Sequence, residues 1–191
     1  RWATILYVED DDANWDVASL LLTRKYWLER ARTAREVVSK LEERSFDLIL
    51  MDIELQGSEL DGIQLTKLLR GKLLSPPGFV EGIEPMDVPI LFMTAYSARY
   101  GEQELVSYGG DGVVPKPVDP EELNAAIWRM LSRQRLVALD AVEKQKDAED
   151  ELEHFKAIQM ESEQQIRGAE RAFEHEKRLR KQMENFLHTI S

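Results

Sequence analysis

The feature that most constrains this chain is an abrupt change of composition near Pro120. All seven prolines lie at or before Pro120, and nine of the ten glycines lie before it. Beyond it, Gly168 alone interrupts a run in which helix-forming residues dominate and charges of both signs are interspersed. Because glycine and proline end helices and shape turns, the first part is predicted to be a compact domain and the second a single long helix.

Within the first part, short apolar runs alternate with segments of helical spacing. Apolar runs typical of strands buried on both faces of a parallel sheet cover 3–8, 47–51 and 89–93, with weaker candidates at 28–31 and 112–114. Helical spacing covers 13–26, 34–43, 62–70 and 98–108, and Thr33 is a candidate N-cap. This order predicts an α/β fold, a five-stranded parallel doubly wound sandwich, followed by the long helix.

Polar side chains follow the predicted strands. In doubly wound folds the working site lies at the carboxyl ends of the strands. Three carboxylates, one hydroxyl and one ammonium group are therefore expected to meet at one rim. The residues that follow the first, third, fourth and fifth strands are Glu9 to Asp12, Asp52, Thr94 with Ala95, and Lys116. A single Asp after a strand is usually a turn or capping residue, but the joint pattern is harder to explain in that way.

The chemistry of such a rim follows from its residue types. Clustered carboxylates repel one another unless a cation shares the site. Oxygen ligands without His or Cys favour a hard ion such as Mg²⁺. A bound Mg²⁺ can orient a phosphoryl group, and a central carboxylate is then a candidate nucleophile that forms an acyl phosphate. Lys116 and Thr94 would contact the phosphoryl oxygens.

Four segments of the chain match one known family in combination. They are ILYVEDD at 5–11, DLILMDIEL at 47–55 with DG at 61–62, PILFMTAYS at 89–97, and GGDGVVPKP at 109–117. Together they resemble a two-component response-regulator receiver domain, with a flavodoxin-like fold, over residues 1–125. Residues 126–191 are then expected to form a coiled-coil dimerisation and signalling helix that leads to an output domain.

The resemblance implies a role for each residue of the rim. Asp52 is expected to be the phosphoacceptor, Thr94 the switch hydroxyl and Lys116 the lysine that contacts phosphate. A phosphohistidine of a donor protein or kinase domain would be the phosphodonor. The Lys116–Pro117 bond is expected to be cis. The expected Mg²⁺ site consists of the acidic pocket Glu9 and Asp10, with Asp52 and the backbone carbonyl of Glu54.

Three features depart from the family pattern. Val113 lies three residues before Lys116, where the family usually has Tyr or Phe, which puts the usual coupling of Thr94 to a rotating aromatic in doubt. The loop after Asp52 reads IELQGSELDG, two residues longer than the common form and with Gln56 where Pro is usual. The connection at 71–88 is unusually long, which leaves two interpretations open: a tolerated surface insertion or a partner-docking loop.

The second part carries a repeating apolar seam. Pro120 suits the first turn of a helix and Asp119 its N-cap. A strict 4-3 spacing from Ile127 to Ile190 has apolar residues at 13 of its 19 positions, which predicts a parallel dimeric coiled coil. Polar members at Gln134, Gln145, Gln159, Ser162, Glu176 and Arg180 weaken the seam. A static dimerisation rod and a two-state transmitter both remain open.

The last eight residues, ENFLHTIS at 184–191, resemble the segment that precedes the phosphorylated His of dimeric histidine kinases. We therefore expect a histidine kinase as the output module, in which case the chain is the N-terminal part of a hybrid histidine kinase. The main alternative is the receiver and coiled-coil segment of a diguanylate cyclase or another response-regulator effector. The chain itself is expected to be a switch, whether or not the longer protein is an enzyme.

Composition and charge exclude other classes of protein. The net charge of −11 argues against direct binding of nucleic acid. The sequence has no apolar run long enough to span a membrane and no signal peptide, and the lack of cysteine fits a cytoplasmic protein. Two alternatives of another kind are an aspartyl-phosphate phosphatase and a vestigial scaffold. The phosphatase signature, D-x-D after the first strand, does not match, because Asp52 follows the third strand and precedes Glu54 by two.

Overall fold

The computed structural model describes residues 2–80, 83–95 and 100–190. Its centre is one parallel sheet with the strand order β2-β1-β3-β4-β5. The strands are β1 (Thr4–Val8), β2 (Trp27–Ala31), β3 (Leu48–Asp52), β4 (Ile90–Thr94) and β5 (Gly112–Pro115). The predicted five-stranded doubly wound sandwich is confirmed, and both weaker strand candidates form its edges.

Five α-helices and one short 3₁₀ helix are described. They are α1 (Asp12–Leu22), α2 (Ala34–Glu43), α3 (Gly62–Leu69), the 3₁₀ helix η1 (Gly78–Val80), α4 (Glu102–Ser107) and α5 (Pro120–Ile190). The helix predicted over 13–26 ends at Leu22, because Tyr26 turns back to pack against the core before β2. The helix predicted from 98 has its first two positions outside the described residues, and α4 begins at Glu102.

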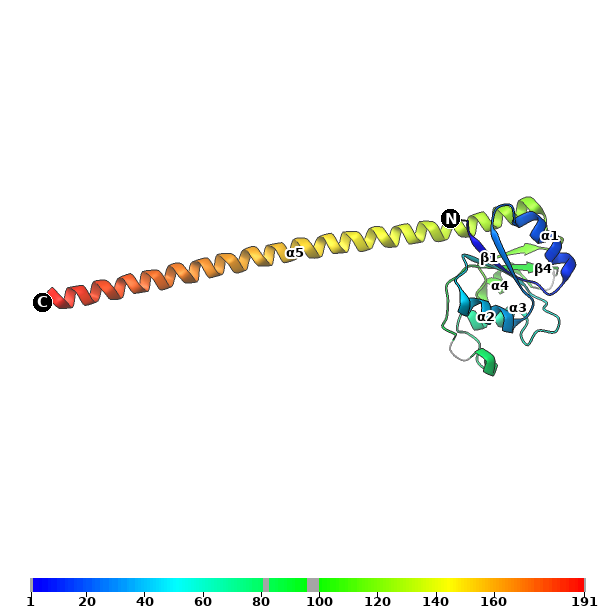
Figure 1. Cartoon of the computed structure of the whole chain (residues 1–191), viewed down its shortest axis with the longest axis horizontal. Helices are drawn as coiled ribbons and strands as arrows, with labels where there is room; N and C mark the ends of the chain where they lie inside the picture. The colour runs from blue at the N-terminus through cyan, green and yellow to red at the C-terminus, as the bar shows by residue number, and fades with distance from the viewer. Residues whose placement is uncertain (1, 81–82, 96–99, 191) are drawn as a thin grey trace. The chain divides into compact units, whose positions relative to one another are not determined.

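Alternation along the strands divides the core into two layers. Ile5 and Tyr7 of β1 face the layer that holds α1 and the first turns of α5, whereas Leu6 and Val8 face the layer that holds α2, α3 and α4. Figure 1 shows α1 on one side of the sheet and α2 and α3 on the other. Because β1, β3 and β4 are buried on both faces, their continuous apolar runs are explained.

The long helix α5 begins as its sequence predicts. The Asp119 carboxylate accepts hydrogen bonds from the backbone N–H groups of Glu121 (3.0 Å) and Glu122 (2.8 Å), so Asp119 is the N-cap. The chain divides into two compact units, 1–135 and 136–191, and the described residues of the second belong to α5. In the part of the chain that the structure describes, no helix has the length and apolar character needed to cross a membrane.

Described residues of the long connection at 71–88 pack on the domain. Val80 is buried, and Phe79, Met86 and Val88 are among the residues that pack against the core layer of α2 and α3. The Arg70 guanidinium donates hydrogen bonds to the backbone carbonyls of Met86 (2.6 Å), Val88 (2.9 Å) and Gly109 (3.0 Å). This half-buried arginine therefore ties the end of the connection to the segment before β5.

Candidate functional site

The predicted rim residues meet at the carboxyl ends of the strands. A hollow of about 230 Å³ lies there. Its lining comprises Glu9, Asp10, Asp11, Asn14, Asp52, Ile53, Glu54, Gln56, Thr94, Ala95 and Lys116. The parallel arrangement brings β1, β3, β4 and β5 to the same edge, as expected for a doubly wound sheet. Asp12 does not join this lining, because its carboxylate pairs instead with Arg30 and Arg32.

Lys116 pairs with two of the carboxylates in the hollow. Its Nζ donates to Glu9 Oε2 at 2.6 Å and to Asp52 Oδ2 at 2.8 Å. Burial would lower the pKa of Lys116, but its hydrogen bonds to Asp52 and Glu9 outweigh burial and raise it. The Lys116 backbone N–H donates to the carbonyl of Thr94 at 2.7 Å, and the Lys116–Pro117 bond is cis, as expected.

Glu9 is completely buried and is held by four donors. Its Oε2 accepts from Lys116 and from the Tyr7 hydroxyl at 2.7 Å. Its Oε1 accepts from the Asp11 backbone N–H at 3.2 Å and from Asn14 Nδ2 at 3.3 Å. Burial and the neighbouring negative charge of Glu9 raise the pKa of Tyr7, which keeps this hydroxyl a donor. Tyr7 was not among the predicted site residues, although its two-residue spacing from Glu9 on an extended chain is a signal for it.

Asp52 is a nearly buried carboxylate, with a side chain 10% exposed. Burial raises the pKa of Asp52 to about 6, against the opposing effect of Lys116 and with support from the charge of Glu9. One oxygen from each of Glu9, Asp10 and Asp52 lies within 4.8 Å of the others. Mg²⁺ prefers such oxygen ligands, a few carboxylates completed by water, so these residues fit that ion.

The loop after β3 contacts Asp10, which lies in the neighbouring loop after β1. Asp10 Oδ2 accepts from the Gln56 backbone N–H at 3.1 Å. The loop closes where the Gly62 N–H donates to the Ile53 carbonyl at 2.9 Å, and a Cβ at Gly62 would lie 1.9 Å from the Asp52 backbone oxygen. Only glycine permits this approach, which closes the loop. The longer loop leaves Asp52 at the rim, as predicted. Val113, at the position where the resemblance led us to expect an aromatic, packs partly buried against the core.

A nearly buried aspartate paired with lysine at the rim of a five-stranded parallel sheet is the arrangement expected of a receiver domain. The family model for the response regulator receiver domain matches residues 5–128, and the chain belongs to this family. Membership in this family implies a part in phosphorelay signal transduction.

Several known proteins are similar to this chain. The uncharacterized transcriptional regulatory protein YrkP of Bacillus subtilis (strain 168) is 32% identical over 130 residues, which are 68% of this chain and 49% of that protein. The probable histidine kinase 6 of Oryza sativa subsp. japonica is 29% identical over 138 residues, which are 66% of this chain and 14% of that protein. The chain therefore spans about half or less of the length of these relatives.

A solved structure with the same fold is the receiver domain of the sensor histidine kinase PA1611 from Pseudomonas aeruginosa PAO1. It superimposes with a TM-score of 0.55 at 25% identity, over 69% of this chain and 99% of that one. That receiver domain has a magnesium ion coordinated in its active-site cleft. The acidic cluster of the present chain consists of Glu9, Asp10 and Asp52.

Proposed function

We propose that this chain is a Mg²⁺-dependent phosphoacceptor switch in which Asp52 receives a phosphoryl group from the phosphohistidine of a donor protein or kinase domain. The observation that carries the proposal is the pairing of a nearly buried Asp52 with Lys116 at 2.8 Å inside a cluster of three carboxylates. A buried, crowded carboxylate has little structural value in an apolar core, whereas it suits chemistry that needs a nucleophile beside a cation.

The side chains of the rim divide the work of phosphoryl transfer. A carboxylate oxygen of Asp52 forms a bond to phosphorus as the P–N bond of the donor breaks, and the electron pair stays on the imidazole nitrogen. Lys116 already binds this carboxylate, and it then contacts an oxygen of the transferred group. Thr94, buried at the end of β4, supplies the hydroxyl that responds to the new phosphoryl group.

Magnesium would be held by Glu9, Asp10, Asp52 and the backbone carbonyl of Glu54. The ion supplies positive charge that offsets both the crowded carboxylates and the phosphoryl oxygens. Glu9 is completely buried and already held by four donors, so we assign it to orienting Lys116 and to the negative field of the site as well as to the ion.

The test is self-phosphorylation with acetyl phosphate and Mg²⁺, followed by intact mass measurement. We expect one added phosphoryl group on the unmodified chain, and none on Asp52→Asn or with EDTA present. Asp61→Asn is the matched control, because Asp61 is exposed and caps α3, and Asn caps a helix equally well. No mass shift in the unmodified chain with Mg²⁺ would support a vestigial scaffold and refute the proposal.

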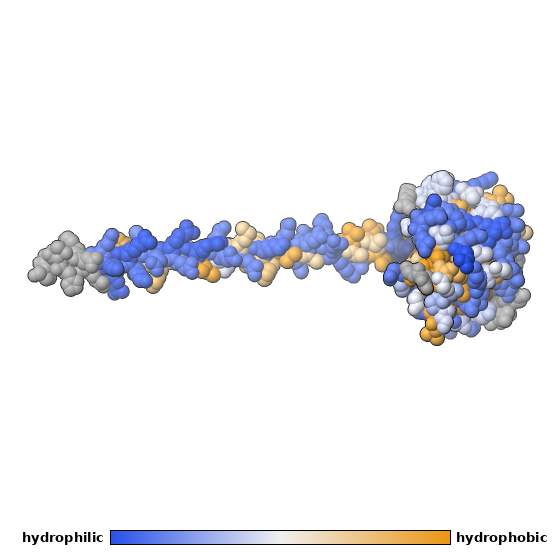
Figure 2. Space-filling model, turned by 60° about the horizontal axis from the view of Figure 1, so that its bottom comes forward, coloured by the Kyte–Doolittle hydropathy of each residue, from blue (hydrophilic) through white to orange (hydrophobic). Residues whose placement is uncertain are grey.

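We further propose that two copies of the chain pair through α5. Five apolar members of the predicted seam are more than half exposed in the single chain: Leu152, Phe155, Ile166, Phe173 and Met183. Figure 2 shows hydrophobic residues among the hydrophilic ones of this helix. A parallel coiled coil would cover the seam of both copies. Because Leu123, Ala126 and Ile127 of α5 pack on the sheet, the state of the rim can reach the helix through these buried residues.

For the output module we propose a histidine kinase, in a cytoplasmic protein. The support is the ENFLHTIS segment at 184–191 and the similarity to a relative named as a probable histidine kinase. The alternative is an effector such as a diguanylate cyclase or, as the name of YrkP favours, a transcriptional regulator. The reading frame after Ser191 decides between them: an immediate His-Glu supports the kinase, and its absence excludes this version.

A further inference from the structure

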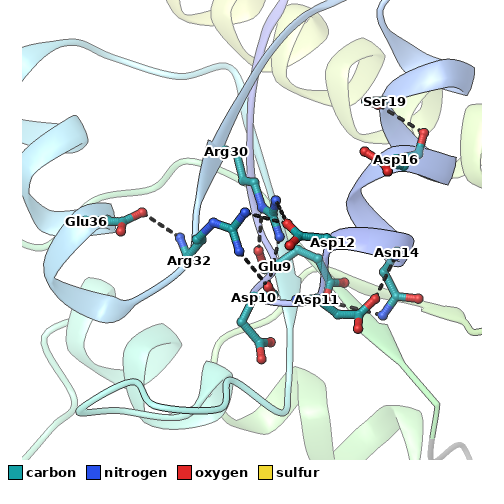
Figure 3. A network of polar contacts seen from close by, with 10 residues as sticks. All are labelled: Glu9, Asp10, Asp11, Asp12, Asn14, Asp16, Ser19, Arg30, Arg32 and Glu36. Carbon is teal, nitrogen blue, oxygen red and sulfur yellow. Dashed lines mark hydrogen bonds and ion pairs between the residues drawn. The ribbon is translucent and has the colours of Figure 1, made fainter.

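Two arginines at the end of β2 contact the backbone of the acidic loop between β1 and α1. Arg30 donates through Nε to the Glu9 carbonyl at 2.8 Å and through a terminal nitrogen to the Asp10 carbonyl at 2.9 Å. Arg32 donates to the same Asp10 carbonyl at 3.1 Å. Arg30 lies in β2 and Arg32 directly follows its last residue, and both guanidinium groups reach the same loop (Figure 3).

Arg30 is itself held firmly. Its side chain is 13% exposed, and its guanidinium carbon lies 5.4 Å from the centre of the Trp15 ring, which stacks on Tyr7. Asp12 Oδ1 accepts from Arg30 at 2.6 Å and also pairs with Arg32. This shared carboxylate reduces the repulsion between the two guanidinium groups and keeps them together.

The contacts with the backbone orient the loop. In Figure 3 the Asp12 carboxylate points toward the two arginines, whereas the Asp10 carboxylate points away from them. With its carbonyl held by Arg30 and Arg32, Asp10 presents its carboxylate to the Gln56 N–H and to the cluster with Glu9 and Asp52. The arginines therefore bind the backbone carbonyls of Glu9 and Asp10, the residues whose side chains line the acidic pocket.

We propose that Arg30, assisted by Arg32, is a positioning residue for the magnesium site; this inference rests on the proposed function. Arg30 acts through the loop and does not touch the ion. Its charge alone would oppose the binding of a cation, whereas its forked hydrogen bonds favour binding by holding the carbonyls of Glu9 and Asp10. Geometry and charge thus predict opposite effects, which a substitution can separate.

Arg30→Lys separates the two effects. Lysine keeps the positive charge, but an ammonium group cannot reproduce the planar fork that spans two carbonyls. Loss of a residue that orients metal ligands typically weakens metal binding by about 10- to 100-fold. We expect the lower end, about 10-fold, for Arg30→Lys, because Arg32 still holds the Asp10 carbonyl.

The matched control is Arg70→Lys. Arg70 is also 13% exposed and also holds backbone carbonyls, but those of Met86, Val88 and Gly109, which do not line the hollow. The two variants therefore lose the same kind of contact with the backbone, and only one loses it at the acidic loop.

The experiment measures Mg²⁺ binding by calorimetry and amide hydrogen exchange of residues 9–14 without metal, on the full chain. We expect Arg30→Lys to weaken Mg²⁺ binding about 10-fold and to speed exchange in the loop, with Arg70→Lys unchanged in both. Arg32→Lys, exposed and with one bond to the loop, should give a smaller effect in the same direction and serves if Arg30→Lys does not fold.

Failures of two kinds would overturn the inference. If the unmodified chain binds Mg²⁺ and neither Arg30→Lys nor Arg32→Lys weakens binding, or if Arg70→Lys weakens it equally, the arginines do not position the site. If the unmodified chain binds no Mg²⁺, the proposed magnesium site fails, and the inference fails with it. The two failures are distinguishable because only the second affects the unmodified protein.

Discussion

Asp52→Asn should stabilise the metal-free domain at neutral pH. Burial raises the pKa of Asp52 from 3.8 to about 6, so the folded protein holds its proton more tightly than the unfolded chain does. Between about pH 4 and pH 6 unfolding releases this proton, and the stability of the unmodified protein therefore falls as the pH rises through that window. Asn carries no charge, so the stability of the Asp52→Asn protein does not fall in this window.

The size of the effect follows from the shift. A difference of about two pKa units corresponds to up to about 3 kcal/mol above pH 6 and to nothing below about pH 4. This is an upper limit, because the uncharged Asn side chain stabilises the Lys116 ammonium group less than the Asp52 carboxylate does. Mg²⁺ should reverse the order, since an ion at about 100 times its Kd stabilises only the chain that binds it, by about 2.7 kcal/mol.

Urea unfolding followed by circular dichroism, in EDTA and at several pH values from 4 to 8, measures the difference. Asp61→Asn is the control and should stay within about 0.5 kcal/mol of the unmodified protein at neutral pH, because Asn replaces Asp as the helix cap. A metal-free Asp52→Asn protein that is less stable at pH 7.5, or a difference that does not change with pH, would refute this electrostatic account.

Three further substitutions test other parts of the molecule. Gly62→Ala should cost at least about 3 kcal/mol in urea unfolding, because the new Cβ meets a backbone oxygen at 1.9 Å, whereas Gly78→Ala, with open space around it, should change little. Lys116→Gln should slow labelling by acetyl phosphate about 10-fold or more in a timed mass measurement; equal rates would remove lysine from the chemistry. Ile166→Asp, on the seam, should shift the chain from dimer to monomer in analytical ultracentrifugation, whereas Met160→Asp, exposed and off the seam, should not; a monomeric unmodified chain would contradict the coiled coil.

Most of the sheet could be predicted because its signals are local. A run such as 48–51 is apolar without interruption only if both faces of the strand are covered, and the structure buries every residue of β3. The predicted end of α1 was wrong because Tyr26 continues the helical spacing, although its side chain packs on the core from a turn. Local periodicity does not distinguish these two ways of burying one aromatic residue.

The candidate site was predictable in its members but not in its contacts. Strand order along the chain and the rule for parallel sheets place Asp52, Thr94 and Lys116 at one rim. The hydrogen bond between Glu9 and Lys116 joins residues 107 apart in sequence, and its length of 2.6 Å depends on how the strands align. Tyr7 lies inside an apolar run and is buried, so only its two-residue spacing from Glu9 distinguished it from an ordinary core residue.

The amino-acid sequence by itself determined the alternation of strands and helices, the residues at the strand ends and the single long helix after Pro120, because periodicity, turn residues and caps act between near neighbours. Tertiary structure alone decided that Arg30 and Arg32 donate hydrogen bonds to the backbone carbonyls of the loop that holds Glu9 and Asp10. It also decided how far burial raises the pKa of Asp52. Both depend on side chains from distant segments meeting in a low-dielectric interior, and that meeting is a property of the packed sheet.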